Sequence, residues 1–192
     1  MNWNYRTPGI PEEYFITGNV PITKTEVRVI TLSKLKLSED SIALDIGCGT
    51  GSVTVEMAQL CSKGLVYSLD KNEDAIELVN KNVEKFQLSN VEILQGEAPG
   101  ALPSITFDRI FIGGGSKSLD EIVNYVHEHL KPGGIVVANT ILLDSTYNML
   151  KLLTDKGFKN IECVNVNISK ASSVPGWMMK AQNPIYIISA VK

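Results

Sequence analysis

The chain has 192 residues, which is long enough for one domain with a substantial core. Hydrophobic residues make up 44% and charged residues 20%, the balance of an ordinary globular protein. The formal net charge of −3 argues against a protein that binds nucleic acid through a strongly basic surface. The N-terminus has no apolar signal core, and no apolar run approaches the roughly 20 residues of a membrane span, so we expect neither secretion nor membrane insertion.

Cysteine and histidine usage gives no sign of a metal site. Cys48, Cys61 and Cys163 lack C-x-x-C spacing, which argues against a disulfide framework or a zinc site and favours a reducing cytoplasm. His127 and His129 lie two apart in a predicted helix, so their side chains point to different sides of it. The sequence therefore predicts no metal.

The chain begins with an irregular segment, residues 1–22, that is punctuated by proline and glycine but keeps several aromatic side chains. Two interpretations stay open: the segment wraps the domain, or it forms a lid over the functional site. Thr23 is a possible N-cap of the next helix, and Glu26 completes a capping-box pattern.

Apolar periodicity then predicts helices and strands that alternate along the chain. The predicted helices are 23–35, 52–61, 73–86, 119–130 and 143–156, and the predicted strands are 42–46, 65–69, 91–94, 107–112, 135–140, 161–168 and 184–191. Residues 169–183 are predicted to be a loop, where an exposed Trp and paired Met suggest a flat apolar contact with a substrate or another subunit. The alternation predicts an α/β fold, with a mostly parallel seven-stranded sheet, helices on both faces and a single domain over 1–192.

The most informative stretch is the turn Asp45-Ile46-Gly47-Cys48-Gly49-Thr50-Gly51, between a predicted strand and a predicted helix. Glycine backbone can approach a ligand closely, and the helix behind the turn directs free N–H groups toward the same space. The spacing does not fit a dinucleotide turn, because Ser52 stands where the third glycine would be, and no lysine follows Gly51 to make a P-loop. The alternative is a tight turn that binds no ligand.

Other candidate residues follow the neighbouring strands. Asp70 lies 19 residues after Gly51, where an acid can accept hydrogen bonds from ribose hydroxyls; alternatively, it only caps the next helix. The turn at residues 95–99 follows the third predicted strand and can present backbone groups to a ligand. For the Glu97 side chain in this turn, the alternative is an ordinary surface carboxylate. The glycines at 113–115 and Asn139 end two further strands at the same edge, where open α/β sheets bind ligands.

The D-x-G-x-G-x-G turn resembles the first motif of the class I methyltransferases, which bind S-adenosylmethionine (SAM). Three stretches together resemble the decarboxylating (cobalt-)precorrin-6B carbon-15 methyltransferases of cobalamin biosynthesis. They are Pro8-Gly9-Ile10-Pro11 with Thr23-Lys24-x-Glu26-Val27-Arg28, then residues 45–56, and then Gly96-Glu97-Ala98-Pro99 with Phe111-Ile112-Gly113-Gly114. The similarity extends over almost the whole chain.

The resemblance implies a class I SAM-dependent methyltransferase fold and transfer of a methyl group from SAM to carbon 15 of a precorrin. It also implies loss of carbon dioxide from the carbon-12 acetate, a homotetramer, and the companion carbon-5 precorrin methyltransferase as a partner. The residues that it implies for SAM are Thr23, Gly47, Cys48, Gly49, Thr50, Gly51, Asp70, Glu97 and Ala98. Glu97 stands where a shorter Asp is common in the family.

The tetrapyrrole substrate carries many carboxylates, so basic side chains are candidates to bind it. The candidate substrate residues are Lys24, Arg28, Gly114, Asn139 and Lys170, with Lys180 as a further basic side chain. Methyl transfer needs alignment more than acid or base, and the sequence names no catalytic residue. The alternatives are a class I methyltransferase for RNA, protein or a small metabolite, and a non-catalytic binding module.

Overall fold

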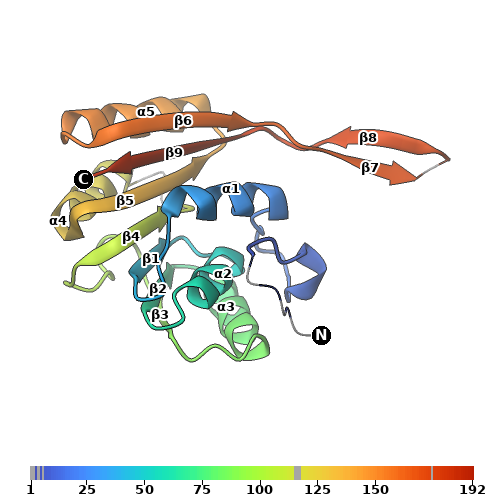
Figure 1. Cartoon of the computed structure of the whole chain (residues 1–192), viewed down its shortest axis with the longest axis horizontal. Coiled ribbons are helices and arrows are strands. Elements are labelled where there is room, and N and C mark those ends of the chain that lie inside the picture. The colour runs from blue at the N-terminus through green and yellow to red at the C-terminus, as the bar shows by residue number, and fades with distance from the viewer. Residues whose placement is uncertain (1–2, 4, 6, 115–117, 174) are drawn as a thin grey trace.

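The computed structural model describes residues 3, 5, 7–114, 118–173 and 175–192. Its centre is a seven-stranded sheet in the order β3-β2-β1-β4-β5-β9-β6 (Figure 1). The strands of this sheet are β1 (Ile42–Ile46), β2 (Leu65–Asp70), β3 (Val91–Gln95), β4 (Phe107–Ile112), β5 (Leu130–Thr140), β6 (Lys159–Val166) and β9 (Ile185–Val191). The strands β1 to β5 pair in parallel, and β9 runs antiparallel to both of its neighbours. The predicted mostly parallel sheet is confirmed.

Helices cover both faces of the sheet, as the alternation predicted. The three helices α1 (Thr25–Leu35), α2 (Ser52–Leu60) and α3 (Glu73–Lys85) lie on one side, and α4 (Leu119–His129) and α5 (Leu143–Asp155) lie on the other (Figure 1). A short 3₁₀ turn, Glu12–Tyr14, interrupts the N-terminal segment. Among the described residues, no helix is both long and apolar enough to cross a membrane.

Strand β1 shows why the central strands read as unbroken apolar runs. Leu44 and Ile46 pack in the core beneath α4 and α5, whereas Ala43 packs in the core beneath α1 and α2. Because both faces of a parallel sheet are covered, successive side chains enter two different cores and both must be apolar. The one acid in β1, Asp45, is fully buried.

The strand order places the functional candidates at one edge. Strand β1 lies between β2 and β4, and the chain order reverses there, which makes a topological switch point. The glycine turn after β1 therefore lies beside the exit of β4, and the amide of Gly113 donates to the Ile46 carbonyl at 2.8 Å.

Two local predictions are wrong. Helix α1 begins at Thr25 and not at Thr23; Lys24 takes the N-cap position without a side-chain hydrogen bond, so the predicted capping box is not formed. The Thr23 carbonyl instead accepts a hydrogen bond from the Arg28 guanidinium. Strand β5 begins at Leu130, earlier than predicted, with a register irregularity before Ile135.

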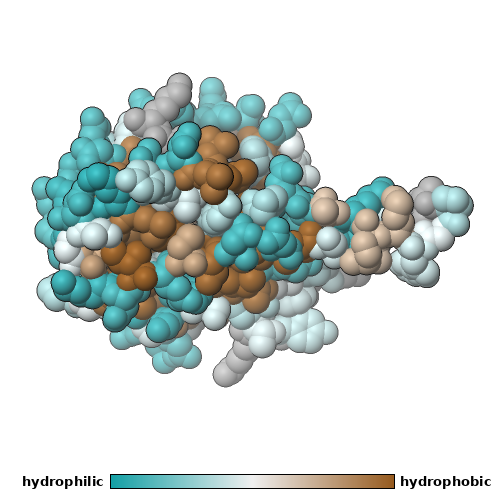
Figure 2. Space-filling view, turned by 90° about the horizontal axis from the view of Figure 1, so that it is seen from above, coloured by the Kyte–Doolittle hydropathy of each residue, from teal (hydrophilic) through white to brown (hydrophobic). Residues whose placement is uncertain are grey.

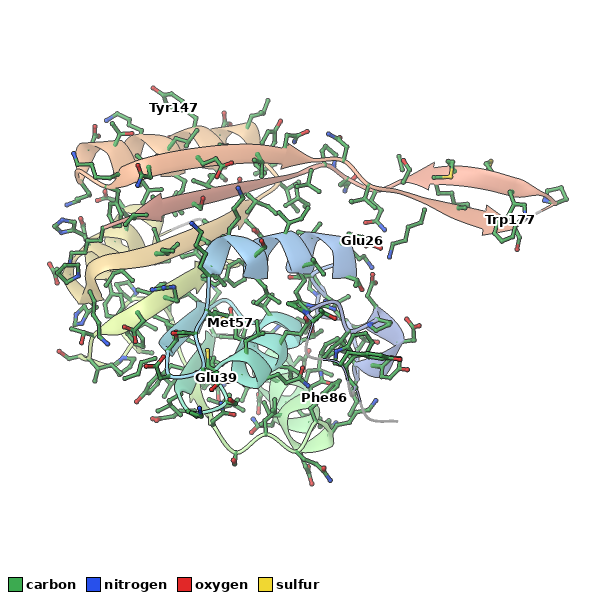
Figure 3. The ribbon with its side chains drawn as sticks, viewed as in Figure 1. Glu26, Glu39, Met57, Phe86, Tyr147 and Trp177 are labelled. Atoms are coloured by element: carbon green, nitrogen blue, oxygen red, sulfur yellow. The ribbon has the colours of Figure 1, made fainter. Side chains whose placement is uncertain are left out.

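The predicted loop at 169–183 is also wrong, because most of it forms a two-stranded ribbon. Strands β7 (Ser169–Ser173) and β8 (Trp177–Ala181) pair with each other and project from the body as an arm (Figures 1 and 2). Every residue of β8 is exposed, and Trp177 is 83% exposed near the ribbon tip (Figure 3). Pairing between β7 and β8 satisfies the backbone hydrogen-bonding groups of both strands although the ribbon has no hydrophobic core. The spacing of apolar residues therefore does not indicate these two strands.

Candidate functional site

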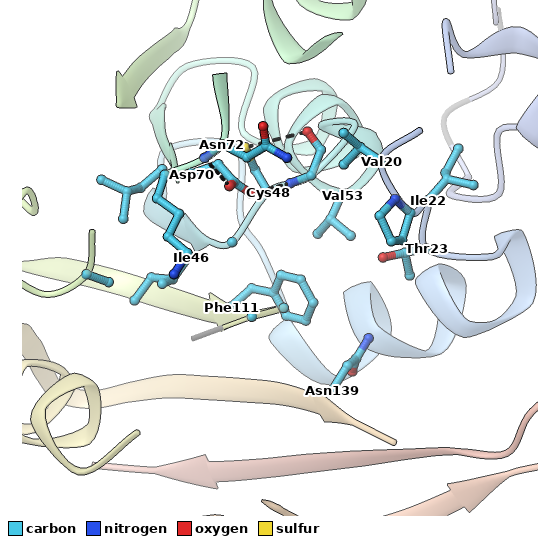
Figure 4. Close-up of a pocket in the computed structure, with 18 of the residues that line it drawn as sticks. Val20, Ile22, Thr23, Ile46, Cys48, Val53, Asp70, Asn72, Phe111 and Asn139 are labelled. Atoms are coloured by element: carbon cyan, nitrogen blue, oxygen red, sulfur yellow. Dashed lines mark hydrogen bonds between the residues drawn. The ribbon is translucent and has the colours of Figure 1, made fainter. Parts of the chain in front are cut away.

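A cavity of about 560 Å³ opens at the carboxyl edge of the sheet, within the size range of small-molecule sites. Figure 4 shows Val20, Ile22 and Thr23 on one side, Asp70 and Asn72 on another, and Phe111 and Asn139 along the base. Ten of the predicted site residues line it: Thr23, Lys24, Gly47, Cys48, Gly49, Asp70, Glu97, Ala98, Gly114 and Asn139. Their contacts with a ligand stay predictions.

Gly47 forms the part of the wall nearest to β4. Its φ is +76°, and a Cβ added there would lie 2.8 Å from both Cα and N of Gly114. A side chain would therefore push the two turns apart as well as strain the backbone. The turn is held by the Leu69 carbonyl at the end of β2, which accepts from the amides of Gly47 and Cys48 at 2.8 and 3.1 Å. Gly115 lies outside the described residues.

The last two residues of the glycine motif stand behind the cavity and do not line it. Thr50 is buried, and its carbonyl accepts a hydrogen bond from Asn82 at 2.9 Å. Gly51 also has a φ of +76°, and a Cβ there would overlap the Val79 side chain on α3. The structure thus gives Thr50 and Gly51 a supporting role: they allow α3 to pack against the turn.

Asp70 joins the end of β2 to the glycine turn. Its Oδ2 accepts from the Gly49 amide at 3.0 Å, and its Oδ1 accepts from the Asn72 amide at 3.0 Å. The N-cap of α3 is Asn72, whose side chain accepts from the Asp74 amide, so Asp70 does not take that position. The half-buried Asp70 carboxylate keeps acceptor capacity on the cavity side for paired hydroxyl groups.

A second acid, Asp45, is sealed beneath the turn. Its Oδ2 accepts from the Thr54 hydroxyl at 2.6 Å, and that hydroxyl lies 2.9 Å from the hydroxyl of Ser68. The other oxygen, Oδ1, has no hydrogen-bond partner among the described residues. Burial, with a further contribution from the negative charge of Asp70, raises the pKa of Asp45 from 3.8 to about 7.

The raised pKa of Asp45 predicts how stability depends on pH. Between about pH 4 and pH 7 the folded protein holds a proton on Asp45 that the unfolded chain has released, so the free energy of unfolding should fall as the pH rises. Asp45→Asn removes this titration, and the difference between the unfolding free energies of variant and wild type should change steadily across that interval. Urea unfolding from pH 4.5 to 7.5 measures it. Parallel curves would contradict the prediction.

The N-terminal segment is tied to the body by a buried ion pair that the sequence did not predict. Arg28 Nε donates to Glu56 Oε1 at 2.5 Å, and the guanidinium also donates to the carbonyls of Thr23 and Ile10. Glu56 in turn accepts from the amides of Gly9 and Ile10 at 2.7 and 3.0 Å. The only sequence signal for this ion pair was Glu56 itself, an acid between Val55 and Met57 in a predicted apolar helix.

This arrangement corrects the prediction that Arg28 binds substrate. The Arg28 side chain is 0% exposed and its guanidinium is engaged with Glu56 and backbone carbonyls, so it has no path to a substrate carboxylate. Arg28 does not line the cavity. Its hydrogen bond to the Thr23 carbonyl instead supports the cavity wall.

Two of the basic candidates outside the core, Lys24 and Lys170, share the carboxylate of Glu12. Lys24 lines the cavity and its Nζ lies 2.7 Å from Glu12. Lys170, on β7, lies 3.0 Å from Glu26 and 3.5 Å from Glu12, away from the cavity lining; Figure 3 shows Glu26 beneath the ribbon. Lys180, on β8, lies opposite Lys170 in the strand register of the ribbon. It does not line the cavity either.

Two predicted residues stand at the cavity base and rim. Asn139, at the end of β5, donates to the Thr31 hydroxyl at 3.0 Å, which fixes its amide against α1. Glu97 is exposed, and its Oε1 lies 3.2 Å from Nζ of Lys71, which also lines the cavity.

Comparison with known proteins gives the family. A family model described as a precorrin methyltransferase domain matches residues 14–192. A protein of Saccharolobus solfataricus, named "Probable cobalt-precorrin-6B C(15)-methyltransferase (decarboxylating)", is 46% identical over 198 residues, with 100% of each chain covered.

Solved structures agree with this match. The crystal structure of a precorrin-6y C5,15-methyltransferase from Geobacter metallireducens is 36% identical with a TM-score of 0.93, and 99% of this chain and 100% of that chain are covered. A precorrin 8W decarboxylase from Methanobacterium thermoautotrophicum is 33% identical with a TM-score of 0.88, with coverages of 94% and 98%. The fold is the predicted class I methyltransferase fold, and the chain belongs to the precorrin methyltransferase family.

Proposed function

We propose that this chain is a SAM-dependent methyltransferase that methylates carbon 15 of a (cobalt-)precorrin and decarboxylates its carbon-12 acetate, in cobalamin biosynthesis. The observation that carries the proposal is the cavity at the switch point, which is lined both by the glycine turn after β1 and by Asp70, the last residue of β2. The name of the Saccharolobus relative, at full coverage of both chains, supports the substrate and the reaction.

The residues present fit SAM. A Cβ at Gly47 would strike Gly114, so only glycine backbone forms this part of the wall. Asp70 offers carboxylate oxygens for ribose hydroxyls, the turn containing Glu97 and Ala98 offers backbone groups for adenine, and Thr23 closes the wall. When bound, SAM supplies a methyl group activated on a sulfonium.

The protein's own contribution is alignment and exclusion of water. The side chains that line the cavity include the apolar Val20, Ile22, Val53 and Phe111, which offer no hydrogen-bond partner to water. Burial raises the pKa of the Cys48 thiol far above its usual range, so Cys48 is a neutral wall group and not a nucleophile. Holding the two reactants in line accounts for the methyl-transfer step without an acid or a base. The carbanion left on the acetate carbon when carbon dioxide departs then takes up a proton to become a methyl group.

Substrate recognition involves three of the predicted residues that line the cavity. Lys24, Gly114 and Asn139 line it, and the Lys24 ammonium can pair with a substrate carboxylate in place of Glu12. We retain Lys170 and Lys180 only as candidates for a substrate that extends over the ribbon.

Titration calorimetry with SAM and S-adenosylhomocysteine tests the cofactor assignment. A turnover assay with precorrin-6B and cobalt-precorrin-6B, following labelled methyl incorporation and carbon dioxide release, tests the reaction. Release of carbon dioxide together with methylation is expected. Failure to bind either nucleoside would overturn the cofactor assignment, and binding without turnover of either tetrapyrrole would indicate another substrate.

The proposal includes a single domain over 1–192 whose segment 1–22 contributes to the site, and a cytoplasmic location. Val20 lies within that segment and lines the cavity, which supports its placement. The three cysteines are free, which fits a reducing compartment. The name of the Geobacter structure pairs positions 5 and 15, which supports a companion carbon-5 methyltransferase as a partner.

The proposed assembly is a homotetramer that uses the ribbon. Trp177 and Met179 share one face of β8 and are 83% and 63% exposed. Large apolar side chains exposed side by side are typical of a surface that contacts another protein. Replacing both by Ser should convert tetramer to smaller species at micromolar protein, because the apolar contacts that hold the subunits are lost. Light scattering after size exclusion measures the mass. Tyr147→Ser, at an exposed aromatic on α5, is the matched control and should leave the mass unchanged.

A further inference from the structure

One wall of the cavity is an irregular segment of residues 16–23, which we call the strap. It crosses α3, where a Cβ at Gly18 would lie 3.4 Å from the Leu78 side chain, and it continues past the glycine turn. Its last residues, Val20 to Thr23, line the cavity. The strap has no helix or strand of its own, so no backbone ladder fixes its distance from the turn.

Asn82 supplies that connection. Its side chain is 0% exposed on α3; Oδ1 accepts from the Ile16 amide at 2.7 Å, and Nδ2 donates to the Ile16 carbonyl at 2.9 Å. The same Nδ2 donates to the Thr50 carbonyl in the glycine turn, also at 2.9 Å. Among the hydrogen bonds of the described residues, no other side chain bonds to both the strap and the turn.

The strap and the turn also meet directly. A Cβ at Gly49 would lie 3.1 Å from the Pro21 carbonyl oxygen, so the two backbones are already close at the cavity edge. Upstream, the amides of Gly9 and Ile10 are held by Glu56, and downstream the Thr23 carbonyl is held by Arg28. Asn82 lies between these two anchors and is the one that fixes the strap relative to the glycine turn.

We propose that Asn82 is a positioning residue for the nucleoside cofactor, which sets the gap between the strap and the glycine turn without touching the ligand. This inference rests on the proposed function, because it assumes that SAM occupies the cavity. Asn82 is not in the cavity lining, so its effect on affinity must pass through the backbone of Ile16 and Thr50. If the strap moves away from the glycine turn, the cavity loses contacts with the ligand although every residue that lines it is unchanged.

The decisive variant is Asn82→Asp, which keeps the acceptor for the Ile16 amide but faces the two carbonyls with oxygen instead of N–H. The matched control is Asn90→Asp. Asn90 also donates through Nδ2 to two carbonyls, those of Ala58 and Cys61 at 3.0 and 2.8 Å, but it lies outside the cavity lining. Both variants lose bonds of the same kind, so a general loss of stability affects both.

Titration calorimetry with S-adenosylhomocysteine, on the full chain below both melting temperatures, gives the dissociation constants. We expect Asn82→Asp to raise the dissociation constant at least about tenfold, the effect of one lost buried hydrogen bond, and Asn90→Asp to change it less than about twofold. Hydrogen exchange should quicken in residues 16–23 for Asn82→Asp alone. Asn82→Ala, which removes the bonds without adding a charge, replaces Asn82→Asp if that variant does not fold.

The outcomes separate the two claims. If wild type binds S-adenosylhomocysteine and the Asn82 variant binds equally well, or if both Asn variants lose affinity equally, Asn82 is not a positioning residue. If wild type does not bind S-adenosylhomocysteine, the proposed cofactor is wrong, and the inference about Asn82 is overturned as well.

Discussion

Replacing Asp70 by alanine is expected to weaken binding of SAM and S-adenosylhomocysteine by about 100-fold. The carboxylate holds the Gly49 amide of the glycine turn at 3.0 Å and lines the cavity with its remaining acceptor capacity. Loss of two charge-assisted hydrogen bonds to ribose hydroxyls would contribute about 3 kcal/mol, which is two orders of magnitude in the dissociation constant. Titration calorimetry at constant ionic strength measures the change.

Asp74→Ala is the matched control for Asp70. It removes the same charge from an exposed position in the first turn of α3, outside the cavity lining, so it should leave the dissociation constant within about twofold. An intermediate variant, Asp70→Asn, keeps one acceptor oxygen and should lose less affinity than Asp70→Ala. Equal dissociation constants for Asp70→Ala and wild type would mean that Asp70 does not bind the ribose hydroxyls.

Replacing Arg28 by methionine is expected to lower the melting temperature by about 10 °C. The side chain fills a similar volume but leaves Glu56 buried and charged without its partner, which costs about 3–5 kcal/mol. The carbonyls of Thr23 and Ile10 lose their donor in the same step. For a domain of this size each kcal/mol shifts the midpoint by about 2–4 °C. Differential scanning calorimetry measures the shift.

Lys34→Met on the same helix is the control for Arg28. It breaks an ion pair with Glu162 at 2.6 Å whose two side chains are 28% and 52% exposed, so the expected loss is below about 1 kcal/mol. The double variant Arg28→Met with Glu56→Leu should recover part of the stability lost by Arg28→Met, because it removes the unpaired charge. Similar melting temperatures for Arg28→Met and Lys34→Met would mean that the buried pair does not anchor the segment.

Local sequence determined the elements that build the cavity. The apolar run of β1, the glycines after it and the apolar face of α2 lie within residues 42–60, so spacing alone predicted strand, turn and helix. Asp70 was found in the same way, because parallel strands separated by helices end at one edge of the sheet. The family resemblance added Thr23, Lys24 and Ala98, which carry no periodic signal of their own but all line the cavity.

Only the tertiary structure decided what the polar side chains inside the protein do. Arg28 meets Glu56, 28 residues away, and Asn82 meets Ile16, 66 residues away. The sequence predicted that Arg28 binds substrate, and it predicted no role for Asn82. Both side chains are buried, and a buried polar group needs a hydrogen-bond partner, which the fold supplies from a distant part of the chain. Periodicity along the sequence does not encode that partner.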